Sequence, residues 1–589
     1  MGVRHHRAGR LSEAETLYRQ VLAAAPDHAD SLHMLGVLAG QSGDVDAGIE
    51  MIRRAIAARP AQAVFHLNLG EIYRRTGKHE LGAQAYAQAA GLCPESEIAH
   101  YCLGLELREL RRLEEAIASY QQAIRLNPNF ADAYAHLAIA AMQLGRVEQA
   151  IEAQQALVRL RPESADAWSN LGTALAEAGR STEAIAAAQR AISLCPGHAN
   201  ARNNLAAALG ADGRYEQALV ECREALRRDP ELAEAHNNLG SILAAMGQLD
   251  EAAASFRRAI AISPDHAAAH FNLALALLIG GKWVAGWPQY EWRWKCFSSA
   301  RPRNFPEPQW GGEPLQGRTI LLHAEQGIGD TIQFVRYVPL VAQRGATVLL
   351  ECQPELRRLL GGLPRVGQLI ARGEALPRFD LQCPLMSLGG VFGTTVDSIP
   401  GPVPYLTADH SLVAAWERKL ATPGKPLVRV KVGLVWSGNP TQKNNRLRSI
   451  PLRSLGALAV VKGIRFLTLQ KGLAADQARN PPPGMELEDF TADLTDFAET
   501  AALLANLDLI ITVDTAVAHL AGAMGLKVWA LLCYAPDWRW LLGRGDSPFY
   551  PTMRVFRQHR PGDWDGVVAE VRSELEAFVR DWLNHKAPA

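Results

Sequence analysis

The chain has 589 residues, of which 48% are hydrophobic, so it is long enough for several domains with full-sized cores. Its 61 Lys and Arg residues balance 61 Asp and Glu residues without a basic stripe, which argues against nucleic acid as a partner. No apolar run reaches the ~18 residues of a membrane helix, and none follows Met1–His6 as in a secretory signal. The eight Cys lack metal-binding spacing, so we expect reduced thiols in a cytoplasmic protein without an integral membrane segment or a metal site.

The first half of the chain repeats with a period of 34 residues. Proline recurs at positions 26, 60, 94, 128, 162, 196, 230 and 264, and leucine recurs at 35, 69, 103, 137, 171, 205, 239 and 273. This period is the tetratricopeptide signature, in which each repeat is a pair of helices. Proline ends the second helix of a pair because it cannot donate the next backbone hydrogen bond. Residues 1–297 are therefore predicted to form an α-solenoid closed by an aromatic cap.

A polar ladder runs along this solenoid, one residue before the repeated leucines. Its four consecutive members are Asn170, Asn204, Asn238 and Asn272. In tetratricopeptide arrays this position lines the concave face, and an amide can both donate to and accept from the backbone of an extended polypeptide. We expect a peptide-binding ladder here, although Asn is also common at this position in such repeats generally.

The composition changes near residue 283, after which twelve of the 13 Trp occur. The aromatic segment 286–294 falls where the next second helix would lie, and we interpret it as the cap that fills the core of the last repeat. Residues 298–316 are rich in Pro and Gly, which predicts a linker.

Residues 317–589 alternate strands with helices, the pattern of parallel sheets covered on both faces. We predict strands at 319–323, 347–351, 379–382, 430–436, 464–469, 508–513 and 527–533, and helices at 330–344, 354–361, 452–461, 496–506, 515–524 and 565–584. A Pro-rich stretch at 400–404 divides them into an N-terminal lobe, 317–405, and a C-terminal lobe, 425–589. Ligands of such sheets bind beyond the carboxyl ends of the strands.

Polar residues follow several of these strand ends. The first strand leads into Glu325-Gln326-Gly327-Ile328-Gly329-Asp330. Gly327 and Gly329 are expected to permit a tight turn and a close approach of a ligand, with Asp330 opening the next helix as a candidate base or only as its cap. Glu325 is a candidate for orienting an acceptor.

The C-terminal lobe carries the anion-binding candidates. The segment Asp514-Thr515-Ala516-Val517-Ala518-His519-Leu520 turns from a buried strand into a helix, whose N-terminus attracts anions. A phosphate is expected against Thr515 and Ala516, a sugar hydroxyl at Asp514, and either a phosphate contact or simple packing at His519. A basic loop at 439–448, with Lys443 and Arg448, either neutralises a diphosphate or is merely solvated.

The second half resembles the heptosyltransferase-like glycosyltransferases of family nine, which have the GT-B fold of two Rossmann-like lobes. The resemblance rests on the segments 326–330, 435–439 and 514–520. It implies Asp330 as the catalytic base, Lys443 or Arg448 on the donor phosphate, and Asp514, Thr515 and His519 on the nucleotide sugar. Ala516 stands where these enzymes usually have Gly, and they lack a repeat array. An array joined to a GT-B domain resembles the layout of protein O-linked N-acetylglucosamine transferases, in which an Asn ladder guides the acceptor polypeptide.

From this resemblance we expect a glycosyltransferase that moves a sugar from a nucleotide-diphosphate sugar to a hydroxyl of a protein or glycan acceptor. The reaction is expected to invert the anomeric centre and to need no metal or other cofactor. Gln470 and Lys471 are candidate nucleoside contacts, and Trp538-Arg539-Trp540 favours aromatic packing over base stacking. Two alternatives stay open: a scaffold with a degenerate GT-B domain, and another GT-B chemistry such as epimerisation of a nucleotide sugar.

Overall fold

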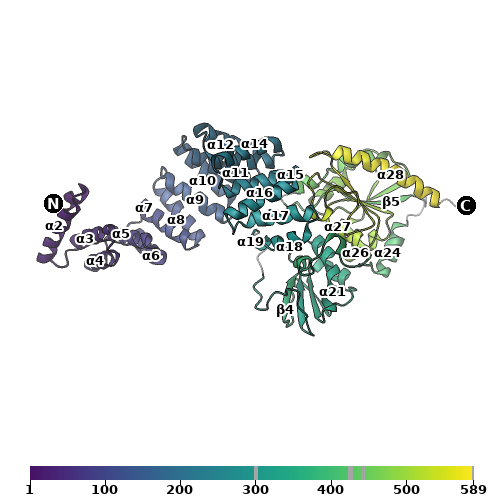
Figure 1. Cartoon of the computed structure of the whole chain (residues 1–589), viewed down its shortest axis with the longest axis horizontal. Helices are drawn as coiled ribbons and strands as arrows, with labels where there is room; N and C mark the ends of the chain where they lie inside the picture. Colours follow the sequence, from purple (N-terminus) through teal and green to yellow (C-terminus); the bar gives the residue numbers. More distant parts are fainter. Residues whose placement is uncertain (297–302, 422–428, 441, 443–444, 587–589) are drawn as a thin grey trace. The chain divides into compact units, whose positions relative to one another are not determined.

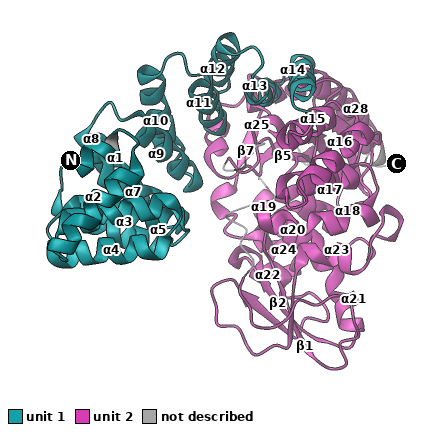
Figure 2. Ribbon diagram, turned by 60° about the vertical axis from the view of Figure 1, so that its left-hand side comes forward, with its two compact units in different colours: residues 1–230 teal, residues 231–589 magenta. Residues whose placement is uncertain are grey.

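In the computed structural model, residues 1–296, 303–421, 429–440, 442 and 445–586 are described. The chain divides into two compact units, Met1–Pro230 and Glu231–Ala589 (Figure 2). The boundary therefore falls inside the repeats rather than at the predicted linker, because the last repeats share a hydrophobic core with the sheets. None of the described helices combines the length and the apolar composition that a bilayer crossing requires.

The predicted solenoid is confirmed as helix pairs in both units (Figure 1). The first unit contains α1 (Gly2–Arg7), α2 (Leu11–Ala24), α3 (Ala29–Ser42), α4 (Val45–Ala58), α5 (Ala63–Arg75), α6 (His79–Leu92), α7 (Glu97–Glu109), α8 (Leu113–Leu126), α9 (Ala131–Gln143), α10 (Val147–Leu160), α11 (Ala165–Glu177), α12 (Ser181–Leu194), α13 (Ala199–Ala211) and α14 (Tyr215–Arg228). The second unit begins with α15 (Ala233–Ala245), α16 (Leu249–Ile262), α17 (Ala267–Ile279) and α18 (Trp283–Tyr290).

Local backbone chemistry explains the regular pairing. The turn between the helices of a pair takes a left-handed conformation, which Gly adopts without strain, as at Gly179 with φ 74°. Arg111 occupies the same turn position and has φ 61°. Within the pairs, a Cβ added at Gly104 would lie 2.6 Å from the Tyr120 ring, so this helix contact requires a residue without a side chain.

The aromatic cap does more than close the last repeat. We call residues 283–296, which form α18 and the short α19 (Arg293–Cys296), the cap. Trp283 stacks on Phe549 at 5.4 Å between ring centroids, and Trp287 meets Trp538 edge-on at 5.5 Å. The Trp287 indole N–H also donates to the Thr394 carbonyl at 2.8 Å. The cap thus packs against both lobes of the second half, whereas the sequence predicted only a seal for the repeat.

Two parallel sheets follow the cap, and they confirm the predicted architecture of two α/β lobes. The N-terminal lobe has the strand order β3-β2-β1-β4, and the C-terminal lobe has the order β10-β9-β8-β5-β6-β7. The strands are β1 (Thr319–His323), β2 (Thr347–Cys352), β3 (Gln368–Ala371), β4 (Leu381–Pro384), β5 (Val430–Val435), β6 (Ile464–Thr468), β7 (Leu487–Asp489), β8 (Leu509–Val513), β9 (Val528–Leu532) and β10 (Met553–Arg557). Strands β1, β2, β8 and β9 are buried almost throughout, as expected for sheets covered on both faces.

Helices cover these sheets and connect their strands. They are α20 (Ile328–Phe334), α21 (Val338–Gln343), α22 (Arg357–Leu360), α23 (Leu388–Val391), α24 (His410–Leu420), α25 (Asn445–Arg448), α26 (Phe497–Leu504), α27 (Ala516–Ala523) and α28 (Trp564–Lys586). The helix predicted at 330–344 is divided by a 3-10 turn at Val335–Tyr337, and the one predicted at 452–461 is a 3-10 helix, η5 (Leu452–Val460). At Gly456 an added Cβ would lie 2.9 Å from Pro482, so this segment is pressed against a neighbouring loop. Strands β3, β7 and β10 were not predicted; each lies at an edge of its sheet, and β3 and β7 have only four and three residues.

The packing of the cap predicts a large effect for Trp287→Ala. The side chain is 4% exposed and contacts both lobes, so its removal should destabilise the second unit by roughly 3–5 kcal/mol. Chemical denaturation followed by Trp fluorescence measures this, since 12 of the 13 Trp lie in that unit. Val284→Ala, at an exposed position of the same helix, is the matched control and should change little. Equal effects of the two substitutions would contradict the packing role.

Candidate functional site

The residue predicted as the base lies directly after the loop that joins β1 to α20. Gly327, not Asp330, is the N-cap of α20, and Asp330 lies three residues inside the helix. The Asp330 Oδ2 atom accepts a hydrogen bond of 2.8 Å from the Gly327 N–H. The prediction that Asp330 itself opens the helix is therefore corrected: its carboxylate reaches back to the cap, as in a capping box. This bond fixes the carboxylate relative to its own loop.

The two glycines of the loop have different reasons to be small. Gly327 has φ −72° and ψ 168°, an extended conformation open to any residue, so the tight turn predicted there is not needed. A Cβ at Gly329 would lie 2.9 Å from the His519 ring and 3.4 Å from Ala516 Cα. Gly329 therefore permits the first turn of α20 to pack directly on the first turn of α27. The sequence predicted that a ligand would come close to Gly329. In the structure, α27 of the C-terminal lobe occupies that position.

Arg539 joins the two lobes at this point, although the sequence indicated only aromatic packing around it. Its guanidinium forms an ion pair with Asp330 Oδ1, donates 2.7 Å hydrogen bonds to Gln333 Oε1 and Asp537 Oδ1, and is 6% exposed. Burial raises the pKa of Asp330, and the positive charge of Arg539 opposes that rise. Asp330 thus faces the C-terminal lobe. The position of Arg539 in the loop after β9, at a strand end, is the signal that could have identified it.

A small cavity lies beside this ion pair in the C-terminal lobe. It encloses about 30 Å³, and its charged lining is Arg448, Asp514 and Asp537. Such a volume is roughly that of one water molecule, so it has room for a hydroxyl group but not for a whole nucleotide sugar. Burial raises the pKa of Asp514 to about 6, reinforced by the nearby Asp537 and opposed by Arg448 and Arg539.

Arg448 belongs to the predicted basic loop, and its side chain reaches the cavity. Its guanidinium lies flat against the backbone of Gly438, where an added Cβ would be 2.7 Å from Nε. Among the described residues, the buried Nε atom has no hydrogen-bond partner. A buried, unsatisfied guanidinium donor is costly and is suited to an anionic ligand. Lys443, the competing prediction, lies outside the described residues.

Helix α27 begins at the same edge of the sheet, directly after β8. Its N-cap, Thr515, makes no side-chain capping bond, and the first turn contains no acidic residue. The Thr515 hydroxyl lies 3.0 Å from that of Thr512. The first N–H groups of α27, including that of Ala516, therefore lack a side-chain acceptor, as the predicted anion site requires.

His519 is a buried residue of α27 itself. Its Nδ1 atom is 3.0 Å from the Tyr550 hydroxyl, and Nε2 is 3.9 Å from Asp514 Oδ1. Burial lowers the pKa of His519 to about 3, so the imidazole is neutral near pH 7. Of the two predicted roles, the structure favours packing, since a neutral, buried ring offers no charge to a phosphate.

The predicted nucleoside contacts follow β6. The Gln470 side-chain carbonyl accepts from the N–H groups of Trp436 and Ser437, and its amide donates to the carbonyls of Ser437 and Lys471. Lys471 donates to the carbonyl of Leu494. Gln470 therefore holds the loop after β5, and a nucleoside contact at either residue stays a prediction.

The Asn ladder takes part in packing between repeats. Asn204 donates to the hydroxyls of Ser169 and Thr173 at 3.0 and 2.9 Å in the first unit. In the second unit, Asn272 donates to Asn237 Oδ1 at 3.0 Å. Asn170 is exposed, and Asn238 is half-buried. At least two of the four amides, those of Asn204 and Asn272, thus use a donor within the solenoid, and peptide binding by the ladder stays a prediction.

Known families match both parts of the chain. Tetratricopeptide repeat models match residues 33–97, 137–199, 187–220 and 209–255, and a TPR repeat model matches 104–145 and 240–279. The glycosyltransferase family 9 (heptosyltransferase) model matches residues 485–542, which include Asp514, α27 and Arg539 but not the loop of Asp330.

Individual known proteins are similar to parts of this chain. Protein FlbA of Caulobacter vibrioides is 27% identical over 332 residues, covering 52% of this chain and 54% of FlbA. The chain thus spans about half the length of this curated relative.

YrrB, a TPR protein with an unusual peptide-binding site, is 27% identical, with a TM-score of 0.26 over 32% of this chain and 96% of YrrB. A tetratricopeptide repeat protein from Parabacteroides merdae is 19% identical, with a TM-score of 0.35 over 42% of this chain and 98% of its own. The chain carries tetratricopeptide repeats in its N-terminal part and, near its C-terminal end, a segment that matches the glycosyltransferase family 9 model.

The raised pKa of Asp514 predicts a pH-dependent stability. Its pKa is about 6 in the folded protein and near 3.8 when unfolded, so the folded state loses stability as pH rises from about 4 to above 6. Asp514→Asn removes this loss, and should therefore stabilise the second unit by about 1–1.5 kcal/mol more at pH 8 than at pH 5. Denaturation followed by Trp fluorescence at both pH values measures the difference. A stabilisation that does not change with pH would contradict a buried, protonated Asp514.

Proposed function

We propose that the second unit is a glycosyltransferase that transfers a sugar from a nucleotide-diphosphate sugar to a hydroxyl of a polypeptide or glycan acceptor. The observation that carries the proposal is the placement of Asp330, from the N-terminal lobe, against Arg539 beside the cavity of Arg448 and Asp514. A candidate base and a candidate anion site thus meet where the two lobes touch. The match of residues 485–542 to family 9 supports the same class of reaction.

In the proposed reaction, Asp330 takes the proton from the acceptor hydroxyl as its oxygen attacks the anomeric carbon. A new carbon–oxygen bond forms, and the bond from that carbon to the donor phosphate breaks, with its electron pair leaving on the diphosphate. Direct displacement of this kind inverts the anomeric centre. Each Asp330 oxygen already accepts one bond, from Gly327 or Arg539, and a carboxylate oxygen has a further lone pair for the acceptor hydroxyl.

The leaving diphosphate is stabilised by protein groups in this proposal. Arg448 supplies an unsatisfied guanidinium donor, and the uncapped first turn of α27 supplies backbone N–H groups and the positive end of its dipole. Asp514 accepts from a sugar or ribose hydroxyl. Because these groups serve the role that a divalent cation has in other transferases, activity is expected to persist in a chelating buffer.

The repeats are proposed to present the acceptor. The exposed side chain of Asn170 suits an extended polypeptide, because an amide can both donate to and accept from a peptide backbone. A cytoplasmic location, which the sequence predicted, fits a nucleotide-sugar donor and remains part of the proposal.

Donor binding can be tested first, by thermal shift with ADP-, GDP- and UDP-sugars. A ligand that binds only the folded state raises the melting temperature, so one of these donors should stabilise the protein. The absence of a shift with every donor would favour the alternative of a scaffold without catalysis.

Asp330→Asn tests the base. This substitution keeps the shape of the side chain but removes its ability to take a proton, so transfer should fall by roughly 10²-fold or more while donor binding persists. Asp409→Asn, at the N-cap of α24 and outside the site, is the matched control and should retain activity, since Asn caps helices as well as Asp. Product formation by mass spectrometry measures both. Wild-type turnover in Asp330→Asn would end the assignment.

Gly438→Ala tests the anion site without removing a charge. The added Cβ would displace the flexible guanidinium of Arg448, so the donor should bind about 10-fold more weakly, corresponding to one charge-assisted hydrogen bond. Gly545→Ala, where a Cβ would meet nothing within 4 Å, is the control in the same lobe. Calorimetric titration with the stabilising donor measures both affinities. Equal affinities would exclude Arg448 from donor binding.

A further inference from the structure

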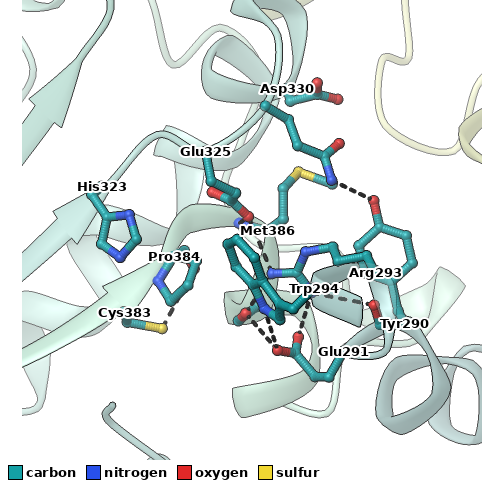
Figure 3. A network of polar contacts seen from close by, with 12 residues as sticks. Tyr290, Glu291, Arg293, Trp294, His323, Glu325, Asp330, Cys383, Pro384 and Met386 are labelled. Carbon is teal, nitrogen blue, oxygen red and sulfur yellow. Dashed lines mark hydrogen bonds and ion pairs between the residues drawn. The ribbon is translucent and has the colours of Figure 1, made fainter. Parts of the chain in front are cut away.

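A second buried arginine approaches the loop of Asp330, and it comes from the cap of the repeats (Figure 3). Arg293 is 1% exposed. Its Nη2 atom lies 3.2 Å from Glu325 Oε1 and donates to the Ser387 hydroxyl at 2.8 Å, while Nη1 donates to Glu291 Oε1 at 2.7 Å. One guanidinium thus connects a residue of the cap with two strand-end loops of the N-terminal lobe.

The carboxylate of Glu325 depends on this arginine. Glu325 is the first residue of the conspicuous loop segment, five residues before Asp330, and its side chain is 6% exposed. Its Oε1 atom also accepts from the Met386 N–H at 3.2 Å, whereas the buried Oε2 atom has no partner among the described residues. Burial raises the pKa of Glu325 to about 7, and Arg293 is the principal group that opposes this rise. Arg293 therefore supplies the charge that compensates an otherwise isolated buried carboxylate.

A second bond ties the same loop to the cap. Gln326 donates from Nε2 to the Tyr290 hydroxyl at 3.2 Å, and Figure 3 shows Tyr290 and Arg293 reaching the loop from the same side. The guanidinium of Arg293 lies over the Tyr290 ring at 5.0 Å and over the Trp294 ring at 4.6 Å. Stacking of this kind restricts the arginine to one position. The two cap residues thus hold two consecutive residues of the loop.

We propose that Arg293, with Tyr290, is a positioning residue for the transferase reaction, through which the cap of the repeat array holds the loop that carries Asp330. The expected effect on catalysis rests on the proposed function. The expected effect on the position of the loop rests only on contacts within the second unit. It assigns to the array a part in building the catalytic site, beyond any part in acceptor binding. A catalytic half lacking the cap would then hold its base in the wrong place.

The choice of arginine fits this role. A planar guanidinium donates in several fixed directions at once, to Glu291, Glu325 and Ser387 in this case. Lysine at the same place would keep the charge but not this geometry. A displacement of about 1 Å in a catalytic group costs on the order of 10²-fold in rate. Loss of Arg293 should therefore slow transfer without removing any group from the donor site.

The experiment compares Arg293→Met, Arg293→Lys and Tyr290→Phe with the control Lys295→Met in the full chain. Lys295 lies on the same short helix but is exposed, and its ammonium contacts Asp265 at 3.6 Å and the Trp292 ring at 4.1 Å from the centroid, not the loop at 325–330. Two readouts are taken: hydrogen exchange of the backbone amides of residues 325–331, and the separate kcat and donor Kd of transfer. The double variant Arg293→Met/Glu325→Gln is included because it removes the uncompensated charge that could unfold Arg293→Met.

We expect faster exchange in residues 325–331 and a kcat at least ~10-fold lower in Arg293→Met, with donor Kd unchanged and a smaller loss in Arg293→Lys. Tyr290→Phe should give the same pattern more weakly, and Lys295→Met should match the wild type. Wild-type exchange and kcat in Arg293→Met, or in the double variant if the single one does not fold, would overturn the inference. If the wild type transfers no sugar, the proposed function fails, and hydrogen exchange alone still decides whether the cap holds the loop.

Discussion

The buried ion pair between Asp330 and Arg539 is the interaction on which the arrangement of the site depends. The two residues are 209 positions apart and come from different lobes. Burying both charges costs several kcal/mol of desolvation, which is repaid only if their other hydrogen bonds are satisfied. Here Asp330 also accepts from Gly327, and Arg539 donates to Gln333 and Asp537. The pair therefore ties the carboxylate to the neighbourhood of the donor site.

Positive charge reaches the centre of the second unit from separate parts of the chain. Arg293 comes from the cap of the repeats, Arg539 from the loop after β9, and Arg448 from α25 after β5. Each of the first two forms an ion pair with one carboxylate of the segment 325–330, whereas Arg448 has no ion pair among the described residues, and a buried Nε without a partner is common to Arg293 and Arg448. The first two arginines stabilise a fixed geometry, and the third is available to a ligand. Arg293 and Arg539 are thus positioning residues, whereas Arg448 is the candidate for binding the donor.

Much of the fold was predictable because its signals are local. The period of 34 residues fixes the register of the helix pairs, and buried strands such as 509–513 read as continuous apolar runs. The strand-end positions of Asp330, Asp514 and Arg448 followed from the parallel sheets. The sequence singled out the segment 325–330 as part of the site, which stays a prediction, and the cap of its helix is Gly327 rather than Asp330.

The rest of the site depends on tertiary contacts that no local pattern carries. Arg539 appeared to belong to an aromatic cluster, because nothing in its own segment indicates a partner in the other lobe. The neutral state of His519 follows from the burial of its ring among side chains of other elements, and the role of Gln470 follows from backbone groups of a different strand end. The aromatic cap was predicted as an end seal, since its contacts with Phe549 and Thr394 join residues more than 100 positions apart.

A double-mutant cycle between Asp330 and Arg539 tests the central claim most directly. The stabilities of the wild type, Asp330→Asn, Arg539→Gln and the double variant would be measured by denaturation of the second unit. A buried pair predicts a coupling free energy of about 1.5–3 kcal/mol, because each single substitution leaves the other charge uncompensated. Additive effects of the two substitutions would contradict the account, since the two lobes would then not be joined through these side chains.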